Sequence, residues 1–550
     1  MTVRVLVAAL TVFAFGLQAQ EKAPQLDSIR KDDMRADLFF LAGDSMKGRV
    51  TNSPTNLIAA EFIQSRFERV GLKPSGPEGS YFQHYNLIEP VIGEENSLEV
   101  QNGDGARIKL RMLHKSFYPE YFSVSGHAQG SLVFAGFGMT VPDLNYDDYR
   151  HANLSGKIVL VLDHEPGEKD PSSPFDGLVL SDSSQPLRKA LFAQAHGAAG
   201  ILFARDVHNH PGPENFGEVA RSNWPAFSLA SWIGKVRIPA AAISSSLASI
   251  LIRDTHKTLE ELSKSAETAT GIEPIAVPGI QVSLTTNVVR RTILDRNVIG
   301  FVEGSDPKLR DEYVIVCAHY DHEGAIGTQI YNGADDDGSG VVGLIEIAQA
   351  YGLAARAGQR PRRTVMFAAW NSEERGLLGS WAYTEHPLLP LDKLVAVLNM
   401  DMIGRNEEIQ VGADERFRGM EVQSAESNSN ALNIIGTLRS PDLKQETERA
   451  NKVIGLDLKF RYDNNISNLL RRSDHWPFIQ HGVPAIWIFT GLHPDYHTVY
   501  DRPAKINYGK MEKVVRCVYQ ESWDLATEDT HPKLLPRKPE AQAVPSPNSR

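Results

Sequence analysis

Residues 334–340 read ADDDGSG and place three carboxylates, Asp335, Asp336 and Asp337, side by side. Adjacent like charges repel, and no basic residue in the stretch neutralises them. Either the run is a solvated turn or a cation binds there. A calcium loop of the EF-hand type is excluded, because its glycine register would put Gly333 at the first ligand position and Leu344 at the glutamate position.

Histidines and further carboxylates stand in four other segments, each at the end of an apolar run or shortly after one. They are His319 and Asp321 in AHYDH, Glu373 and Glu374 in WNSEE, Asp401 in NMD, and His493, His497 and Asp501 in HPDYHTVYD. Any one of these motifs occurs by chance. Together, imidazoles and carboxylates without thiolates suit zinc in a catalytic site. The set exceeds the needs of one ion, and two neighbouring ions require a bridging group, usually a carboxylate.

The elements that must position these residues begin at about residue 285. The predicted strands are EYVIVCAHYDH, RRTVMFAAW, KLVAVLNMD and PAIWIFTG, and the predicted helices between them are SGVVGLIEIAQAYGLAAR and EERGLLGSWAYTEH. Buried strands that alternate with helices predict an α/β fold, with a mostly parallel central sheet and helices on both faces. Ligands bind beyond the carboxyl ends of such strands, so the five segments are expected at one edge of one sheet.

The preceding part of the chain has a different character. Residues 27–72 are predicted to be helical, and NLIAAEFIQSRFERVGL ends in a glycine where a helix would stop. A β-rich block follows, with strands in GSLVFAGFG, GKIVLVLDHEP and AAGILFARD and long loops at 165–185 and 207–232. This block contains no cluster of His, Cys, Asp and Glu at ligand spacing. Its histidine pair, His208 and His210, could bind a metal, but without carboxylate support it is expected to be exposed.

Composition limits the classes of function. The 550 residues favour two to four domains, and the net charge of −11 argues against a nucleic-acid partner. Residues 1–19 are predicted to be a secretory signal, which makes the protein exported, either periplasmic or secreted. No later stretch is apolar enough for a membrane segment in the mature chain. Cys317 and Cys517 are expected to be buried and unlinked, and residues 531–550 to form a disordered tail.

The ordered motifs AHYDH, GADDDGSG, WNSEERGLLGS, NMDMIG and YHTVYD resemble those of a two-zinc metallopeptidase family, which includes bacterial zinc aminopeptidases and glutamate carboxypeptidase. The resemblance implies a zinc exopeptidase fold whose catalytic domain comprises residues 27–95 and 285–528. The middle block, 110–275, resembles the protease-associated domain inserted into such enzymes. The implied cofactor is two Zn²⁺ per chain, and the implied partners are peptide substrates.

The resemblance also implies a role for each matching residue. His319 and Asp401 would hold one zinc ion, Glu374 and His497 the other, and Asp336 would bridge both. Glu373 would be the general base, and Tyr496 would donate a hydrogen bond to the developing oxyanion. Asp321 would orient His319, and Asp501 would orient His497.

Weaker candidates lie near these motifs. Asp474 and His475 in RRSDHWPF, together with Arg405, are candidates for substrate binding. The alternative for RRSDHWPF is a helix start that is capped by Ser473. The remaining histidines of the region, His322, His386, His481 and His493, are expected to lie on the surface.

Three functions remain open at this stage. The first is an aminopeptidase, the second a carboxypeptidase or dipeptidase on the same two-zinc scaffold, and the third an inactive binding or receptor domain. The complete ligand set with Glu373 argues against the inactive form. The presence of both His319 and Asp401 argues for two metals rather than the single zinc of the related glutaminyl cyclases. The sequence makes no prediction of the oligomeric state.

Overall fold

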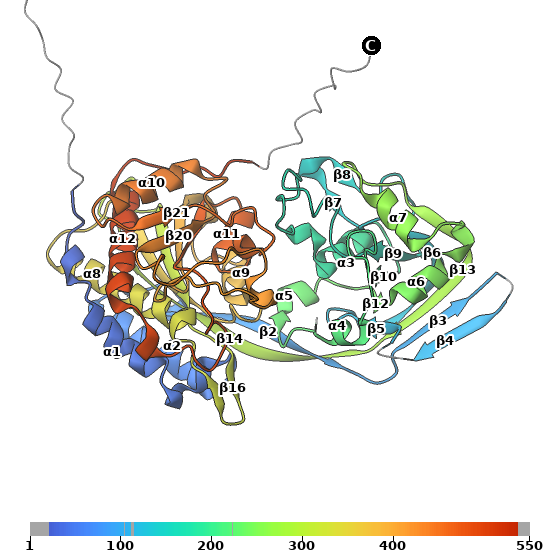
Figure 1. Cartoon of the computed structure of the whole chain (residues 1–550), viewed down its shortest axis with the longest axis horizontal. Coiled ribbons are helices and arrows are strands. Elements are labelled where there is room, and N and C mark those ends of the chain that lie inside the picture. Colours follow the sequence, from blue (N-terminus) through green and yellow to red (C-terminus); the bar gives the residue numbers. More distant parts are fainter. Residues whose placement is uncertain (1–20, 104, 112–114, 223, 537–550) are drawn as a thin grey trace, which may run out of the picture.

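The computed structural model describes residues 21–536 except 104, 112–114 and 223. The predicted signal at 1–19 lies outside the described residues, as does most of the predicted tail. Figure 1 shows two units side by side, each built around its own sheet. We call residues 21–92 and 288–536, together with residues 228–229 that join their sheet, the core unit. The remaining residues between 93 and 287 are the inserted unit.

The core unit contains a ten-stranded mixed sheet. Its four central strands are parallel and lie in the order β18 (Thr364–Trp370), β15 (Tyr313–His319), β19 (Leu394–Met400) and β22 (Ala485–Phe489). Antiparallel strands flank them: β14 (Val288–Val302), β2 (Phe82–Ile92), β11 (Ser228–Leu229) and β1 (Lys73–Pro74) on one side and β20 (Ala431–Ile435) on the other, where β21 (Asp457–Lys459) runs parallel to β20. The predicted α/β class is confirmed, and parallel pairing dominates only the centre of the sheet.

Helices cover both faces of this sheet, and β15 shows how the chain divides between them. Val314, Val316 and Ala318 point into one apolar cluster, whereas the alternate residues Ile315 and Cys317 point into another. The first cluster is covered by α1 (Lys31–Leu41), α2 (Pro54–Val70), α8 (Gly340–Arg356) and α12 (Tyr508–Thr527), with α10 (Pro441–Asn451) packed against α12. The second is covered by α9 (Leu378–Glu385) and α11 (His475–Gln480).

Local sequence accounts for both ends of α2. The Ser53 hydroxyl accepts the Asn56 N–H at the start of α2, and Gly71 ends that helix with φ +85°. The helix predicted over EERGLLGSWAYTEH begins only at Leu378, so the prediction placed its start too early. Residues 371–377 instead form a turn that presents Glu373 and Glu374 at the end of β18.

The inserted unit has an eight-stranded sheet. Its strand order is β4 (Arg107–Arg111), β3 (Ser97–Gln101), β13 (Ile275–Thr286), β6 (Gly126–Phe134), β9 (Ile158–Leu162), β10 (Gly200–Ala204), β12 (Ala240–Ile243) and β5 (Phe117–Pro119). The associated helices are α3 (Pro186–Ala195), α4 (Phe216–Ser222), α5 (Ala230–Ile233), α6 (Ser245–Leu251) and α7 (Leu259–Ala266). The sheet extends from 97 to 286, wider than the predicted 110–275, because β3, β4 and β13 pair within it.

Three further expectations from the sequence can be compared with the structure. Cys317 and Cys517 are both buried and free, as predicted. The start of the predicted tail is not detached, because the Leu535 N–H donates to the Arg439 carbonyl at 2.6 Å. Among the described residues no helix combines the length and apolarity needed to cross a bilayer.

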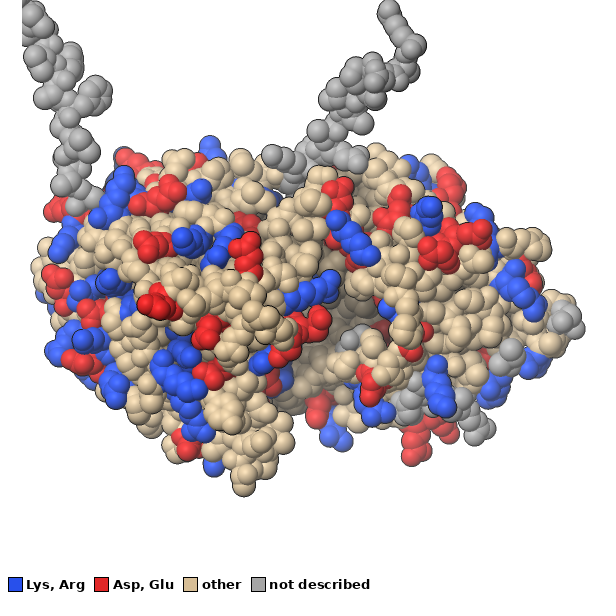
Figure 2. All heavy atoms as spheres, viewed as in Figure 1, with Lys and Arg blue, Asp and Glu red and all other residues tan. Residues whose placement is uncertain are grey.

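Charged side chains are numerous on the molecular surface. On the face seen in Figure 2, basic and acidic side chains are interspersed, and a hollow separates the two units.

Candidate metal centre

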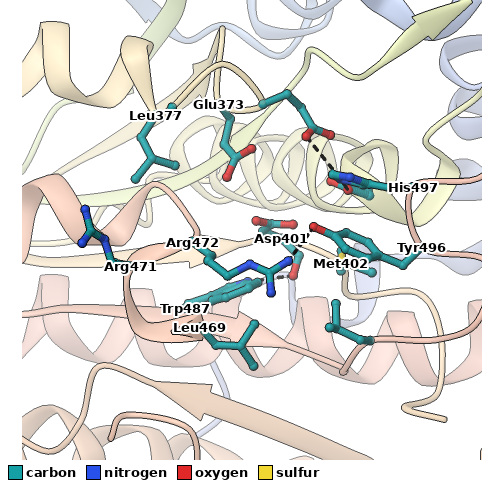
Figure 3. A pocket seen from close by; sticks show the side chains of 14 residues that line it. Glu373, Leu377, Asp401, Met402, Leu469, Arg471, Arg472, Trp487, Tyr496 and His497 are labelled. Carbon is teal, nitrogen blue, oxygen red and sulfur yellow. Dashed lines mark hydrogen bonds and ion pairs between the residues drawn. The ribbon is translucent and has the colours of Figure 1, made fainter. Parts of the chain in front are cut away.

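The carboxyl ends of the central strands deliver the candidate ligands to one place. His319 is the last residue of β15, Asp401 follows β19 directly, and Glu373 and Glu374 lie in the turn after β18. Asp336 comes from the turn that leads into α8. His497 lies in the loop after β22, and together with Asp336, Glu373, Glu374 and Asp401 it lines a cavity of about 250 Å³ (Figure 3).

One group of side chains surrounds His319, whose side chain is 1% exposed. Its Nε2 lies 3.2 Å from Asp336 Oδ1 and 3.7 Å from Asp401 Oδ1. Its Nδ1 faces Asp321 Oδ1 at 3.6 Å. Neither ring nitrogen makes a hydrogen bond to a described residue, although both are buried. A buried imidazole without hydrogen bonds, surrounded by carboxylates, is typical of a site that binds a cation.

A second group shares Asp336 with the first. His497 Nε2 lies 3.0 Å from Asp336 Oδ2 and 3.2 Å from Glu374 Oε2. The two oxygens of Asp336 therefore face two different histidines, the arrangement expected of a bridging carboxylate. His322 joins this group with its Nδ1 2.7 Å from Glu374 Oε1. The expectation that His322 is a surface histidine is wrong, because its side chain is fully buried.

These residues fit a zinc pair. The donors are imidazoles and carboxylates, the combination found at catalytic zinc sites. Three carboxylates (Asp336, Glu374 and Asp401) are at least 95% buried within one small volume, and that charge density is costly unless cations neutralise it. The unpartnered nitrogens of His319 complete the fit.

The other two aspartates of ADDDGSG accept hydrogen bonds from backbone N–H groups instead of facing the imidazoles of His319 and His497. Asp337 accepts hydrogen bonds from the His319 and Met402 N–H groups at 3.1 and 3.2 Å. Asp335 accepts the Gly404 N–H at 2.6 Å, and its other oxygen lies 3.2 Å from His493 Nε2. His493 is also fully buried, so the expectation of a surface position is wrong for it too.

Asp501 does not lie where the resemblance placed it. Its carboxylate accepts the N–H groups of Asp335 at 2.9 and 3.0 Å and of Asp336 at 3.2 Å. Asp501 therefore fixes the aspartate turn, and no contact with His497 is observed. Asp321, the residue predicted to orient His319, accepts the Glu373 N–H at 3.0 Å and faces His319 as described above.

Glu373 stands beside both groups and lines the cavity. Its Oε2 lies 3.8 Å from His319 Nε2, farther than the carboxylates that flank that nitrogen. Burial, together with the neighbouring Asp401 and Glu374 carboxylates, raises the pKa of Glu373 well above its ordinary value. A carboxylate with a raised pKa at the edge of a metal centre suits proton transfer.

Tyr496 and Arg472 form the opposite wall of the cavity in Figure 3. The Tyr496 hydroxyl accepts a hydrogen bond from Arg472 Nη2 at 3.0 Å, which leaves its own proton for another acceptor. Burial raises the pKa of Tyr496 to about 12, so the hydroxyl stays protonated near neutrality. The Tyr496 ring stacks on that of His497 with 4.0 Å between centroids.

The predicted substrate residues do not line this cavity. Asp474 is fully buried and accepts the Ser380 hydroxyl, and His475 is buried against Trp487. Arg405 pairs with Asp495 at 3.0 Å. The arginines that do line it are Arg471 and Arg472.

Ser473 does not cap α11, so that alternative is also wrong. Its hydroxyl donates to Asp401 Oδ2 and accepts a hydrogen bond from Asn399 at 2.7 Å. Ser473 thus orients a candidate ligand. Neither this contact nor the burial of His322 could be found from the sequence, because both depend on strands that are distant along the chain.

Comparisons with known proteins agree with this geometry. Residues 297–521 match peptidase family M28. A probable glutamate carboxypeptidase of Arabidopsis thaliana, AMP1, is 27% identical over 405 residues, which are 69% of this chain and 51% of that protein. Aminopeptidase NAALADL1 of Mus musculus is 36% identical over 236 residues, 40% of this chain and 29% of that protein. The chain thus spans at most about half the length of these relatives.

A solved structure supports the fold. The aminopeptidase from Aneurinibacillus sp. strain AM-1 superposes with a TM-score of 0.50 at 18% identity, covering 92% of this chain and 96% of that one. At this identity the likeness concerns the fold alone.

Proposed function

We propose that the chain, whose residues 297–521 match peptidase family M28, is a zinc-dependent exopeptidase with Glu373 as its general base. The observation that carries this proposal is the sharing of Asp336 between two histidine–carboxylate groups beside a free-standing glutamate. An inactive binding domain would have no need of that arrangement.

The two metal positions are assigned as follows. His319, Asp336 and Asp401 would hold one zinc ion, and His497, Glu374 and Asp336 the other. His322 is a further candidate for the second position, because its Nδ1 faces Glu374. When bound, the ions would lower the pKa of the attacking water and polarise the scissile carbonyl.

The residues of the chain would supply the proton transfers. Glu373 accepts the proton of the attacking water and then passes it to the leaving amine. The Tyr496 hydroxyl donates a hydrogen bond to the carbonyl oxygen as negative charge develops on it. Arg472 holds the Tyr496 hydroxyl in place by donating a hydrogen bond to its oxygen. The positive charge of Arg472 makes the Tyr496 O–H a stronger hydrogen-bond donor.

The size of the cavity favours removal of a terminal residue. At about 250 Å³ it is slightly smaller than typical ligand pockets of roughly 300–1,000 Å³. A cavity of this size suits the binding of a single residue with its peptide group.

For the end that is cleaved, we propose the N-terminus. A free α-amine needs acidic groups. Glu323, which pairs with Arg375 at 3.3 Å, has a carboxylate within 4.8 Å of ligand atoms of Glu374 and His497 and adds negative charge beside the cavity. The second candidate is a carboxypeptidase or dipeptidase. Two arginines, Arg471 and Arg472, line the cavity and favour it, because guanidinium groups bind carboxylates.

A substrate panel tests the direction. Aminoacyl-p-nitroanilides have a free amine and no terminal carboxylate, whereas N-blocked dipeptides have the reverse. The N-terminal proposal predicts hydrolysis of the first class alone, and exclusive hydrolysis of the second would establish the alternative. The variant Arg472→Met tests the alternative directly. If Arg472 binds the substrate carboxylate, its loss should raise KM for N-blocked dipeptides tenfold or more.

Metal removal tests the zinc requirement on the same panel. Chelation is expected to abolish hydrolysis of every substrate, and zinc add-back to restore it. Full activity after exhaustive chelation, with metal analysis showing an empty protein, would refute a zinc enzyme.

A further inference from the structure

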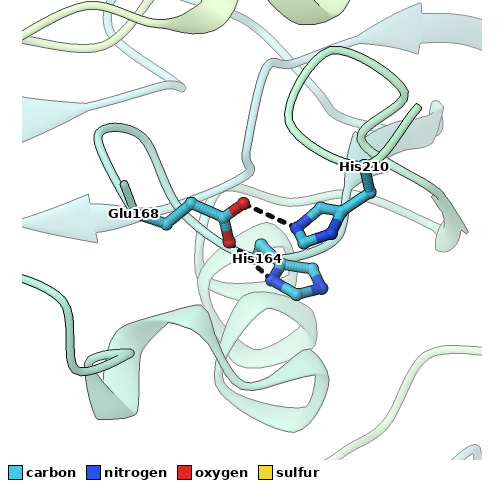
Figure 4. A group of neighbouring side chains, drawn as sticks. All are labelled: His164, Glu168 and His210. Carbon is cyan, nitrogen blue, oxygen red and sulfur yellow. Dashed lines mark hydrogen bonds and ion pairs between the residues drawn. The ribbon is translucent and has the colours of Figure 1, made fainter. Parts of the chain in front are cut away.

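A second cluster of histidine and carboxylate side chains lies in the inserted unit, away from the candidate metal centre. His164 and Glu168 belong to the loop that follows β9, and His210 belongs to the loop that follows β10 (Figure 4). Because β9 and β10 are parallel neighbours, their carboxyl ends bring the two loops together. His164 Nδ1 lies 2.7 Å from Glu168 Oε2, and His210 Nε2 lies 2.6 Å from Glu168 Oε1.

From the sequence, His208 and His210 were the candidate metal-binding pair of this region, and we expected them to be exposed loop histidines without carboxylate support. The structure separates them, since His208 Nδ1 faces Glu260 at 2.8 Å. His210 instead meets His164, 46 residues earlier in the chain, with 4.1 Å between ring centroids.

Hydrogen bonding does not account for the whole cluster. Glu168 Oε1 and His210 Nε2 are buried and only 2.6 Å apart, yet neither makes a hydrogen bond of acceptable geometry. The Glu168 side chain is 7% exposed, so its charge is held away from bulk water. Two imidazole nitrogens directed at the two oxygens of one buried carboxylate form a ready set of metal ligands.

Other residues hold the two loops in place. Asp163 accepts the Asp206 N–H at 2.7 Å, which joins the loops directly. Glu267 of the segment after α7 accepts the Gly167 N–H at 2.8 Å. The buried ammonium of Lys189 donates to the carbonyl of His164 at 2.5 Å. The three candidate ligands are therefore positioned by a scaffold to which their own side chains do not contribute.

We propose that His164, Glu168 and His210 form a third zinc site. Two imidazoles and one carboxylate are a ligand set of zinc enzymes that leaves a fourth position open. Ligand atoms of tetrahedral zinc lie about 3.3 Å apart, so binding would separate these atoms by less than about 1 Å. The open position faces a cavity of about 410 Å³ and would hold water or an anionic ligand.

The position of the site between the two units indicates what it does. The far wall of the cavity consists of Arg418, Ile466 and Asn468 of the core unit. The loop that carries His164 and Glu168 continues to Leu180, whose carbonyl accepts a hydrogen bond from Arg471 at 2.6 Å. Zinc would clamp this loop onto the His210 loop and fix the surface that contacts Arg471.

The zinc content of the full-length protein tests the site. Protein is equilibrated with Zn²⁺ and dialysed, and metal per chain is measured for the wild type and for Glu168→Gln and His210→Gln. Both variants are expected to contain one zinc fewer than the wild type. His208→Gln, the control from the same loop, is expected to match the wild type. Equal zinc contents in all four proteins, or the same loss in the control, would overturn the proposal.

A second measurement needs no substitution. His164 and His210 are 31% and 28% exposed, so diethylpyrocarbonate can reach them in the wild-type protein. Mass spectrometry is expected to show that Zn²⁺ protects both from modification at least fivefold, while His208 is unprotected. Modification of His164 and His210 that is indifferent to Zn²⁺ would refute the site. Neither measurement depends on peptidase activity, so failure of the proposed function would leave both readouts intact.

Discussion

At the scale of single residues, three adjacent aspartates have three different tasks. Asp336 faces two histidines with its two oxygens, Asp337 accepts backbone N–H groups from the ends of β15 and β19, and Asp335 meets Gly404 and His493. The repulsion that makes the sequence look unfavourable is relieved by partners that lie far along the chain. Substitutions at neighbouring positions should therefore have different effects.

Asp336→Asn is expected to abolish activity and to reduce bound zinc by at least one equivalent, because a neutral amide is a poor bridge between cations. Asp335→Asn should retain zinc and lose stability instead, since its contacts are with backbone and His493. Metal analysis and thermal unfolding of both variants check this contrast. Equal zinc loss in the two variants would contradict the assignment of the bridge.

Glu373→Gln is expected to keep its zinc and lower kcat by 10³-fold or more, because glutamine has the shape of the base without its ability to accept a proton. Steady-state kinetics with metal analysis gives the answer. A variant with near-normal kcat would show that Glu373 is not the base.

At the scale of elements, the sequence was most informative where apolar runs and their periods are strong. The strands that carry His319, Asp401 and the Glu373–Glu374 turn were all predicted, and so was α2 with its terminal glycine. The start of α9 was wrong because Ser372, Gly376 and Leu377 have positive φ, which interrupts a right-handed helix before Leu378. Asp321, more than 50 residues earlier, holds this turn by accepting the Glu373 and Glu374 N–H groups. The width of the inserted sheet was missed because β3 and β13 pair across a separation of about 180 residues. Local patterns do not report pairing at such distances.

The contact between α10 and α12 contains a buried carboxyl group with a predictable pH effect. Glu521 accepts the Thr447 hydroxyl at 2.7 Å, and burial raises its pKa from the ordinary value of 4.5 to about 8. The folded protein therefore retains a proton that the unfolded chain loses as pH rises through this window, so stability falls between about pH 4.5 and 8.

Glu521→Gln is expected to remove this penalty while keeping an oxygen for Thr447. The variant should be more stable than the wild type by on the order of 3 kcal/mol at pH 8. At pH 5 the difference should nearly vanish, because both side chains are then neutral. Thermal unfolding at the two pH values checks the prediction, and a pH-independent difference would contradict it.

At the scale of the whole molecule, Arg471 connects the two units beside the candidate metal centre. It lines the cavity of the metal centre and donates to the Leu180 carbonyl of the inserted unit. Its guanidinium also lies over the Trp476 ring, 5.9 Å from the centroid. The inserted unit thereby supports one wall of the cavity without lining it.

Arg471→Met is expected to raise KM fivefold or more and to change kcat less, because it loosens a wall and leaves the reacting groups in place. Arg516→Met is the matched control, since Arg516 also donates to a backbone carbonyl, that of Ile29, within the core unit. Steady-state kinetics on both variants tests the coupling. A KM effect of equal size in the control would argue against it.

The connection between the units has a consequence for substrate choice. A single residue, Asn287, separates β13 of one sheet from β14 of the other, and β14 pairs with β2 along 11 residue pairs up to that junction. Because paired strands resist bending, we expect the inserted unit to keep its position beside the cavity. If the proposed exopeptidase function holds, short peptides that enter end-first should then be cleaved in preference to folded proteins, whose size keeps their chain ends away from the cavity.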